Sequence, residues 1–293
     1  MEFYLMLIAS SLMVSVDFVF NKLYQRRCGA TLQSGLFFNL LIGLFSAAIF
    51  FCVGGFRIEL TPFSVIAALI MTATAITYVI IGFFILSKGK MAYYSFFRMS
   101  GSMLIPYIWG VLALGEELTP LRTVGVALIL LSAVLLYADS FGMRVRYVWM
   151  LLAVFLLAGT VSVISKMHAI SPSAVSPIGY VVLTSLAKPM LCAPILLVLR
   201  ARGKGKEEAQ GFRLHGGIVT LTLIFFSALI TGLAYILQLH SAAKLPASVV
   251  YPIVTGGSIV FTMLAGWVFF RERPKGKMLA AAGVAFLGTC LFL

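Results

Sequence analysis

The chain has 293 residues, of which 61% are hydrophobic and only 11% are charged. A soluble globular protein of this length could not cover its surface with so few polar side chains, so the composition excludes that class. The formal net charge of +13 would suit a nucleic-acid binder, but the positions of the charges along the chain exclude that partner as well. The sequence therefore predicts an all-α integral membrane protein.

Ten apolar segments are each long enough to cross a hydrocarbon core, which takes about 20 residues of helix. In chain order, we expect transmembrane helices at residues 3–24, 34–53, 63–86, 92–114, 121–138, 147–166, 175–199, 217–240, 247–270 and 277–293. Turn and charge signals separate these segments, for example Gly54-Gly55 and Gly115-Glu116. Pro189 and Pro194 predict a kink in the seventh segment.

Lys and Arg are concentrated in alternate connections between the expected helices. One set of connections holds fifteen of them: Arg26, Arg27, Lys88, Lys90, Arg144, Arg146, Arg200, Arg202, Lys204, Lys206, Arg213, Arg271, Arg273, Lys275 and Lys277. The other set holds four: Arg57, Arg122, Lys166 and Lys244. The positive-inside rule places the first set in the cytoplasm, which puts both chain termini on the outer side of ten spans.

One sequence pattern occurs twice in the chain. GSMLIPYIWGVLALGE at 101–116 and GSIVFTMLAGWVFFRE at 257–272 share an initial Gly-Ser, a Gly nine places on and a Glu fifteen places on. Near the start of each half, FNKLY at 20–24 corresponds to ISKMH at 164–168. We therefore predict two five-helix halves, residues 1–140 and 145–293. Because five is odd, the second half enters the membrane from the opposite side, and the halves form an inverted repeat.

Two features resemble a known family. Gly115-Glu116 and Arg271-Glu272 close the fourth span of each half, and VGVALILLSAVLL and AAAGVAFLGTCLFL follow as short last helices. With the ten-span, two-repeat layout, they resemble the EamA branch of the drug/metabolite transporter superfamily. The resemblance implies an exporter in the bacterial cytoplasmic membrane. Since one chain contains both orientations of the repeat, we expect a functional monomer.

The ninth span, VVYPIVTGGSIVFTMLAGWVFF, also resembles the third helix of the small multidrug resistance proteins. The resemblance puts Tyr251 at the place of their substrate-facing tyrosine. In that family a membrane-embedded Glu precedes a Lys by eight residues, whereas Val14 and Ala158 stand at the places before Lys22 and Lys166. Proton-coupled cation export by that glutamate therefore cannot be transferred to this chain.

Three ionisable residues lie inside the expected spans: Asp17, Arg98 and Lys188. Each costs several kcal/mol in a bilayer unless it is paired or hydrated. Asn21 lies four residues after Asp17 and therefore on the same helix face. One interpretation is that Asp17 forms an internal ion pair with Arg98 or Lys188, and the other is that these residues bind substrate or a proton directly.

Polar stripes on four helices predict a central aqueous cavity, because polar groups cannot face acyl chains unsatisfied. The stripes are Thr74 and Tyr78; Tyr94, Arg98 and Ser102; Tyr180, Thr184 and Lys188; and Ser227, Thr231, Tyr235 and Gln238. Members of each stripe are three or four residues apart, which places them on one face of a helix. By contrast, we expect Glu116 and Glu272 to be structural, with Glu116 near the N-terminus of the fifth helix.

Two cations against one anion make the predicted site positive by about one unit, which favours a carboxylate or phosphate ligand. We expect a secondary transporter of a small anionic or zwitterionic metabolite, such as an amino acid or organic acid, that works by alternating access. Asp17 is the candidate carrier of a coupling proton. No His, Cys or carboxylate cluster indicates a metal or cofactor.

Three alternatives stay open at this point. The first is a multidrug or lipophilic-cation exporter that uses Asp17 alone. The second is a lipid-carrier flippase with a lateral opening near Pro246 and Pro252. A membrane-embedded enzyme is the third, and it lacks the expected pairing of a nucleophile with a base at helical spacing.

Overall fold

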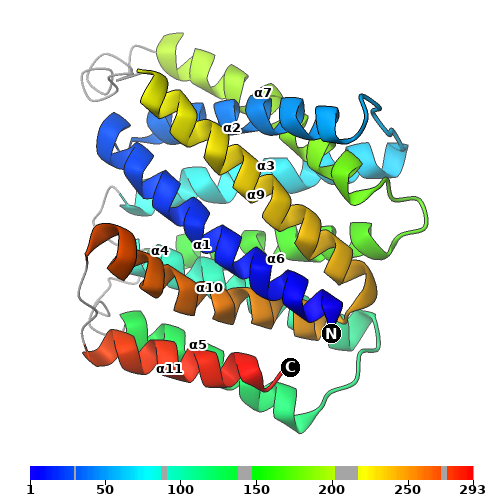
Figure 1. Cartoon of the computed structure of the whole chain (residues 1–293), viewed down its shortest axis with the longest axis vertical. Helices are drawn as coiled ribbons and strands as arrows, with labels where there is room; N and C mark the ends of the chain where they lie inside the picture. Colours follow the sequence, from blue (N-terminus) through cyan, green and yellow to red (C-terminus); the bar gives the residue numbers. More distant parts are fainter. Residues whose placement is uncertain (30, 87–90, 138–146, 202–216, 272–275, 293) are drawn as a thin grey trace.

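The computed structural model describes the whole chain except residues 30, 87–90, 138–146, 202–216, 272–275 and 293. The described residues form ten helices and no strand (Figure 1). They are α1 (Glu2–Cys28), α2 (Leu32–Val53), α3 (Pro62–Leu86), α4 (Met91–Ala113), α5 (Pro120–Tyr137), α6 (Val148–Ile170), α7 (Pro177–Ala201), α9 (Ile218–Lys244), α10 (Ala247–Phe270) and α11 (Gly276–Cys290). Each of the ten expected spans is therefore occupied by a helix.

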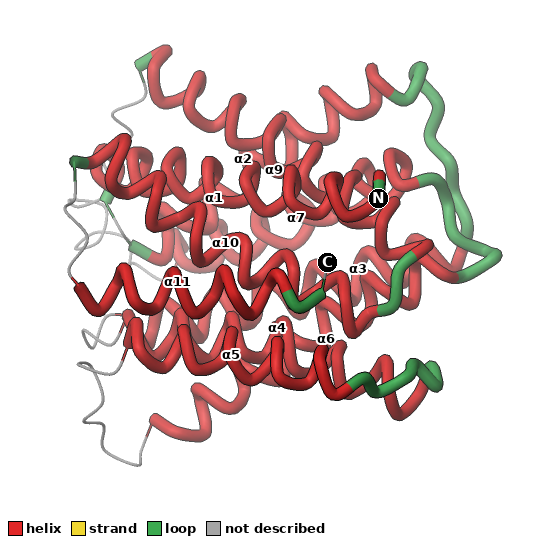
Figure 2. The backbone as a smooth tube through the Cα atoms, turned by 60° about the horizontal axis from the view of Figure 1, so that its bottom comes forward, coloured by secondary structure: helices red, strands yellow, loops and turns green. Residues whose placement is uncertain are grey.

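Seven of these helices are long and apolar enough to cross a membrane: α1, α2, α3, α6, α7, α9 and α10. Two others, α5 and α11, are apolar but shorter. The remaining helix, α4, is 23 residues long and carries Arg98 together with Ser100 and Ser102. The helices lie side by side with their connections at two opposite ends of the bundle (Figure 2). The structure thus supports a helical membrane protein, and the full set of ten spans stays a prediction.

Local signals set the sharp turn between α1 and α2. Gly29, which ends α1, has a φ of 80°, a conformation that suits glycine because a Cβ would be strained there. Thr31 precedes α2, and its Oγ1 accepts a hydrogen bond from the backbone N–H of Ser34 at 3.2 Å. This N-cap satisfies one of the free N–H groups of the first turn. The turn lies at the mouth of the cavity described below.

The packing between helices follows one pattern in both parts of the chain. Helix α1 packs against α9 and α10, and α6 packs against α3 and α4. Three more pairs connect the two parts: α2 with α7, α4 with α10 and α5 with α11 (Figure 1). If the five helices of residues 1–137 are matched in order with the five of residues 148–290, α1 corresponds to α6 and α3 to α9. Each contact named here then corresponds to another of these contacts or to itself.

The repeated Gly-Ser stretch lies at two of these contacts. A Cβ on Gly101 of α4 would collide with the backbone of Phe155 in α6, and one on Gly257 of α10 would collide with the Ser11 side chain of α1. The two glycines therefore allow the same kind of close approach, once between α4 and α6 and once between α10 and α1.

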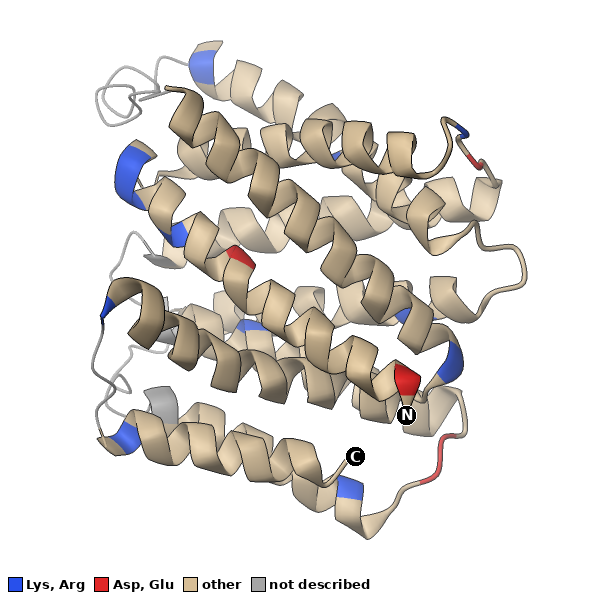
Figure 3. Cartoon of the chain, in the orientation of Figure 1, with Lys and Arg blue, Asp and Glu red and all other residues tan. Residues whose placement is uncertain are grey.

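Described Lys and Arg side chains lie at both ends of the bundle in Figure 3, and the end at the left also has the termini of several helices that carry them. Arg26 and Arg27 end α1, Arg200 lies in the last turn of α7 and Arg271 caps α10. We call this end, where α1 and α7 end and α11 begins, the basic end. Ten of the fifteen predicted cytoplasmic cations lie outside the described residues: Lys88, Lys90, Arg144, Arg146, Arg202, Lys204, Lys206, Arg213, Arg273 and Lys275. Glu272 lies outside them as well.

Candidate functional site

A cavity of about 250 Å³ lies among α1, α2, α3, α4, α7 and α9. Seven of the predicted site residues line it: Asp17, Asn21, Tyr78, Tyr94, Arg98, Lys188 and Thr231. The cavity continues past Gln25 to Gly29 and Thr31, so it extends toward the basic end of the bundle. Four of the helices that contribute are those on which the sequence placed polar stripes.

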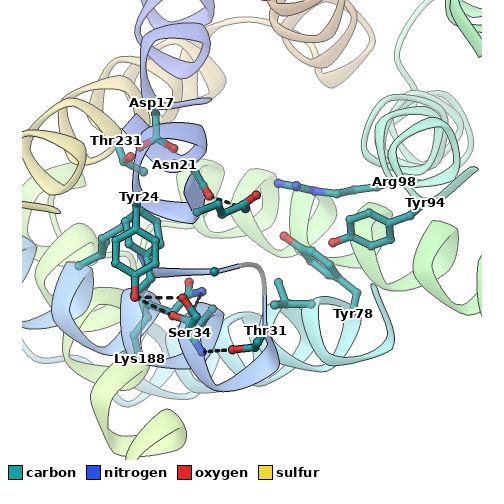
Figure 4. Close-up of a pocket in the computed structure, with 17 residues that line it drawn as sticks. Asp17, Asn21, Tyr24, Thr31, Ser34, Tyr78, Tyr94, Arg98, Lys188 and Thr231 are labelled. Atoms are coloured by element: carbon teal, nitrogen blue, oxygen red, sulfur yellow. Dashed lines mark hydrogen bonds between the residues drawn. The ribbon is translucent and has the colours of Figure 1, made fainter. Parts of the chain in front are cut away.

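Asp17 is half-buried on α1, and its carboxylate accepts a hydrogen bond from Ser227 Oγ on α9. Thr231, one turn further along α9, lies beside Asp17 (Figure 4). The Thr231 hydroxyl is buried and lies within hydrogen-bonding reach of the Asp17 carboxyl group. The acid is therefore held by α9 on one side and faces the cavity on the other.

Arg98 extends from α4 into the cavity, with Tyr94 and Tyr78 beside it (Figure 4). Its guanidinium carbon lies 5.5 Å from the centre of the Tyr78 ring, within the range of a cation–π interaction. Tyr94 lies one turn before Arg98 on the same face of α4 and also lines the cavity. These rings fix the direction of the guanidinium without neutralising its charge.

Lys188 enters the cavity from α7, where α2 packs very closely. A Cβ on Gly43 of α2 would lie 2.8 Å from the Cβ of Lys188 and 2.7 Å from Pro189 Cδ. Glycine at this position therefore lets α2 approach α7 at the level of the lysine. Within the described part of the chain, the Lys188 ammonium makes no hydrogen bond and no ion pair with another residue.

The internal ion pair that the sequence left open is not formed in this structure. Among the described residues, no Lys or Arg is in ion-pair contact with Asp17, whose polar partner is Ser227. Arg98 and Lys188 instead face the same cavity as Asp17, from α4 and α7. The site thus contains two cations that no protein carboxylate in contact neutralises.

The other five predicted residues lie outside this cavity: Tyr180, Thr184, Tyr235, Gln238 and Tyr251. Thr184 donates to the carbonyl of Tyr180 at 3.0 Å, which is an interaction within one helix. Gln238 is half-buried on α9, one turn beyond Tyr235. The cavity does not extend that far toward the opposite end of the bundle, and a binding role for these five residues stays a prediction.

Tyr180, Tyr235 and Tyr251 belong to a polar-aromatic layer toward this opposite end, which also contains His168, Ser165 and Met71. Tyr180 stacks on His168 with ring centres 3.5 Å apart. The Tyr235 hydroxyl lies 3.0 Å from Ser165 Oγ and 3.3 Å from Met71 Sδ. Tyr251 donates to the carbonyl of Ser162. These contacts join α3, α6, α7, α9 and α10.

Sequence reasoning missed the wall of the cavity that α2 and the end of α1 provide. The additional lining residues include Tyr24, Gln25, Thr31, Ser34 and Asn39. Tyr24 lies three residues after Asn21, so it continues the stripe that begins at Asp17 and could have been recognised. Asn39 carried no comparable signal, because the residues around it on α2 are almost all apolar.

The sequence model of the EamA-like transporter family matches residues 145–293, just over half of the chain. The chain belongs to the EamA-like transporter family. This family is part of the drug/metabolite transporter superfamily, so the chain is a membrane transporter with a small-molecule substrate. The match begins within the connection before α6 and covers the whole second set of five helices.

The fold of this EamA-family transporter is also found in a solved structure. A protein of known crystal structure is similar with a TM-score of 0.75 and 18% sequence identity, over 97% of this chain and 94% of that one. At this identity the likeness shows the fold alone. No curated protein matches the chain.

Proposed function

We propose that this EamA-family protein is a secondary active transporter of a small anionic or zwitterionic metabolite, such as an amino acid or organic acid, in the bacterial cytoplasmic membrane. The observation that carries the proposal is the pair Arg98 and Lys188, which line the Asp17 cavity without a carboxylate in contact. A cation inside a bilayer costs several kcal/mol unless it is compensated. A carboxylate of the substrate supplies that compensation.

Other groups of the cavity also favour an anion. The side-chain oxygen of Asn21 accepts a hydrogen bond from Gln25 Nε2 at 2.8 Å, so the amide hydrogens of Asn21 remain for a ligand. The Tyr78 and Tyr94 hydroxyls line the cavity beside Arg98. Asp17 is the acidic residue of the lining, and it already accepts a hydrogen bond from Ser227.

Alternating access between two inverted halves, residues 1–140 and 145–293, is the mechanism that the packing favours. The contacts of α1 with α9 and α10 correspond to those of α6 with α3 and α4. Inverted repeats of this kind can exchange inward and outward shapes around a fixed central site. Because one chain supplies both halves, we propose a functional monomer.

The observed shape is consistent with a cavity open toward the cytoplasm. The cavity leads to the basic end, which the positive-inside rule places in the cytoplasm. At the opposite end, the polar-aromatic layer and the Glu116 carboxylate connect several helices. We propose that substrate enters from the cytoplasm in this state and that the layer opens to release it.

Capacitive currents from proteoliposomes adsorbed on a solid support test the proposal. Amino acids, organic acids, phosphate esters and lipophilic cations are applied in turn to the wild type, Arg98→Ala and Lys188→Ala. Loss of a charged ligand contact costs about 1.5–3 kcal/mol, so we expect affinity for the anionic substrate to fall by about 10- to 100-fold in both variants. Lys244→Ala, an exposed lysine at the end of α9, is the matched control and should leave the currents unchanged.

The cation-exporter alternative makes the opposite prediction. If Asp17 alone binds the substrate, lipophilic cations produce currents that persist in Arg98→Ala and Lys188→Ala. The same currents disappear in Asp17→Asn. That result would replace the anion proposal.

A further inference from the structure

We propose that the site is built for a dianion, a dicarboxylate or a phosphate monoester, and that this substrate binds together with one proton on Asp17. The inference rests on the proposed function and specifies its substrate class. It follows from the charges that line the cavity, their placement on different helices and the Thr231 hydroxyl beside Asp17.

The protein does not itself neutralise both cations of the cavity. Two other acids of the described chain are occupied at the opposite end of the bundle. Glu116 accepts from the backbone N–H groups of Ala247 at 2.6 Å and Ser248 at 2.8 Å, and Glu59 accepts from that of Ser176 at 2.6 Å. Among the described residues of the lining, Asp17 is the single acid facing Arg98 and Lys188. Neutralisation of both positive charges in the cavity therefore depends on the ligand.

The two cations occupy separate positions. Arg98 extends from α4, which packs on α3, α5, α6 and α10, whereas Lys188 extends from α7, which packs on α2, α3 and α9. Tyr78 and Tyr94 lie beside the arginine (Figure 4), and Ile42 of α2 is part of the cavity lining. One carboxylate satisfies one of these positions. A ligand with two negative charges can satisfy both.

With a dianion bound, an ionised Asp17 leaves the site with one negative charge in excess. A proton taken from the water of the cavity converts Asp17 to the neutral acid and balances the site. The groups that face Asp17 are Ser227 and Thr231 from α9, Lys188 from α7, and Arg98 with Tyr94 from α4; Tyr78 from α3 lines the same cavity. From α10, the titratable side chain is Tyr251, which is bonded to Ser162 outside the cavity.

The hydroxyl of Thr231 can accept a hydrogen bond from the protonated Asp17 carboxyl group. A protonated carboxyl group is a hydrogen-bond donor and needs an acceptor. Thr231 lies beside Asp17 (Figure 4), and its buried hydroxyl is within hydrogen-bonding reach of the Asp17 carboxyl group. Ser227 already occupies one carboxylate oxygen of Asp17, so the second oxygen can carry the proton toward Thr231.

The test uses the purified full-length chain in proteoliposomes that contain a pH-sensitive dye. Labelled counterflow is measured with a four-carbon dicarboxylate, its monomethyl ester as the matched monoanion, glycerol phosphate and alanine. All measurements stay in the pH range in which both charges of the dianions are present. We expect the dianions to move with one proton each and the monomethyl ester to move with none. The dicarboxylate and the phosphate ester distinguish the two possible sources of the dianion.

Two variants examine the residues. Asp17→Asn should lose the proton signal that accompanies the dianion. Thr231→Val keeps the shape of the side chain and removes the hydroxyl that Asp17 can hydrogen-bond, so we expect the pH of half-maximal dianion transport to shift by about one unit. Thr220→Val, on the same helix but away from the cavity lining, is the matched control and should not shift the profile.

The outcomes separate the two proposals. Dianion transport without a proton, or transport restricted to monoanions or zwitterions that depends on Arg98 and Lys188, overturns this inference and leaves the proposed function intact. Counterflow of lipophilic cations without any anion overturns both. A proton signal that persists in Asp17→Asn also overturns the inference.

Discussion

The Ser227 hydroxyl on α9 donates a hydrogen bond to the Asp17 carboxylate on α1, which joins residues 210 positions apart in the chain. The bond holds the acid on the α1–α9 contact, at the wall of the cavity. Asp17 is therefore positioned by a helix of the other half of the chain.

Ser227→Ala should weaken this contact. Hydrogen bonds between transmembrane helices contribute about 0.6 kcal/mol on average and up to about 1.7 kcal/mol. Because the acceptor here is a carboxylate, we expect a coupling free energy of about 1–2 kcal/mol between Ser227→Ala and Asp17→Ala. A double-mutant cycle on denaturant unfolding in detergent measures it, and additive effects would contradict the bond.

Glu116 should be a stability residue that acts at the end of another helix. Its two carboxylate oxygens accept from Ala247 N and Ser248 N, at the first turn of α10. A carboxylate at this position satisfies free N–H groups and interacts favourably with the helix dipole. We expect Glu116→Ala to lower the free energy of unfolding by about 1–2 kcal/mol. Glu117→Ala, at the exposed neighbouring position, should change it little.

The sequence predicted that Glu116 is structural but placed it near the wrong helix. The expected partner was the fifth helix, which begins four residues later at Pro120. In the structure the carboxylate instead accepts hydrogen bonds from the first turn of α10. Gly110 makes this possible, because a Cβ there would lie 2.8 Å from the Glu116 carboxyl carbon. Sequence spacing shows which residues recur, but it does not show which distant helix end a side chain reaches.

Helices and polar stripes could be predicted because hydropathy and a spacing of three or four residues are local properties. Which residues of each stripe line the cavity could not be predicted in this way. Lys188 and Tyr180 share a face of α7, yet Lys188 lines the cavity and Tyr180 is fully buried against His168. The difference depends on depth along the bundle, which is set by the packing of all neighbouring helices.

The paired lysines Lys22 and Lys166 show the same limit. Lys166 donates to the carbonyls of Ala242 at 2.6 Å and Leu245 at 2.7 Å at the end of α9. Lys22 lies over the Phe270 ring, 4.3 Å from its centre. The two lysines that the sequence paired thus have different contacts at the two ends of the bundle.

Gly101→Ala should disrupt the contact between α4 and α6. The new methyl group would meet the backbone of Phe155, which cannot move aside as a flexible side chain can. Overpacking of this kind costs about 1–3 kcal/mol. Gly283→Ala is the matched control: a methyl group there would have no neighbouring atom within 4 Å, and alanine favours the helix by up to about 1 kcal/mol. Thermal unfolding should therefore shift in opposite directions for the two variants.

Access to the cavity should be one-sided. In a background with Cys52 and Cys290, the two exposed cysteines, replaced by serine, Asn21→Cys should react with a membrane-impermeant maleimide added at the basic end. Gln238→Cys should stay protected from that end, because the polar-aromatic layer lies between it and the cavity.

His168→Ala removes the ring stacked on Tyr180 and the hydrogen bond with Ser64 at 2.9 Å. We expect this change to loosen the layer and make Gln238→Cys reactive from the opposite side. Equal labelling of Asn21→Cys from both sides in the His168 wild type would show that the layer does not close the cavity.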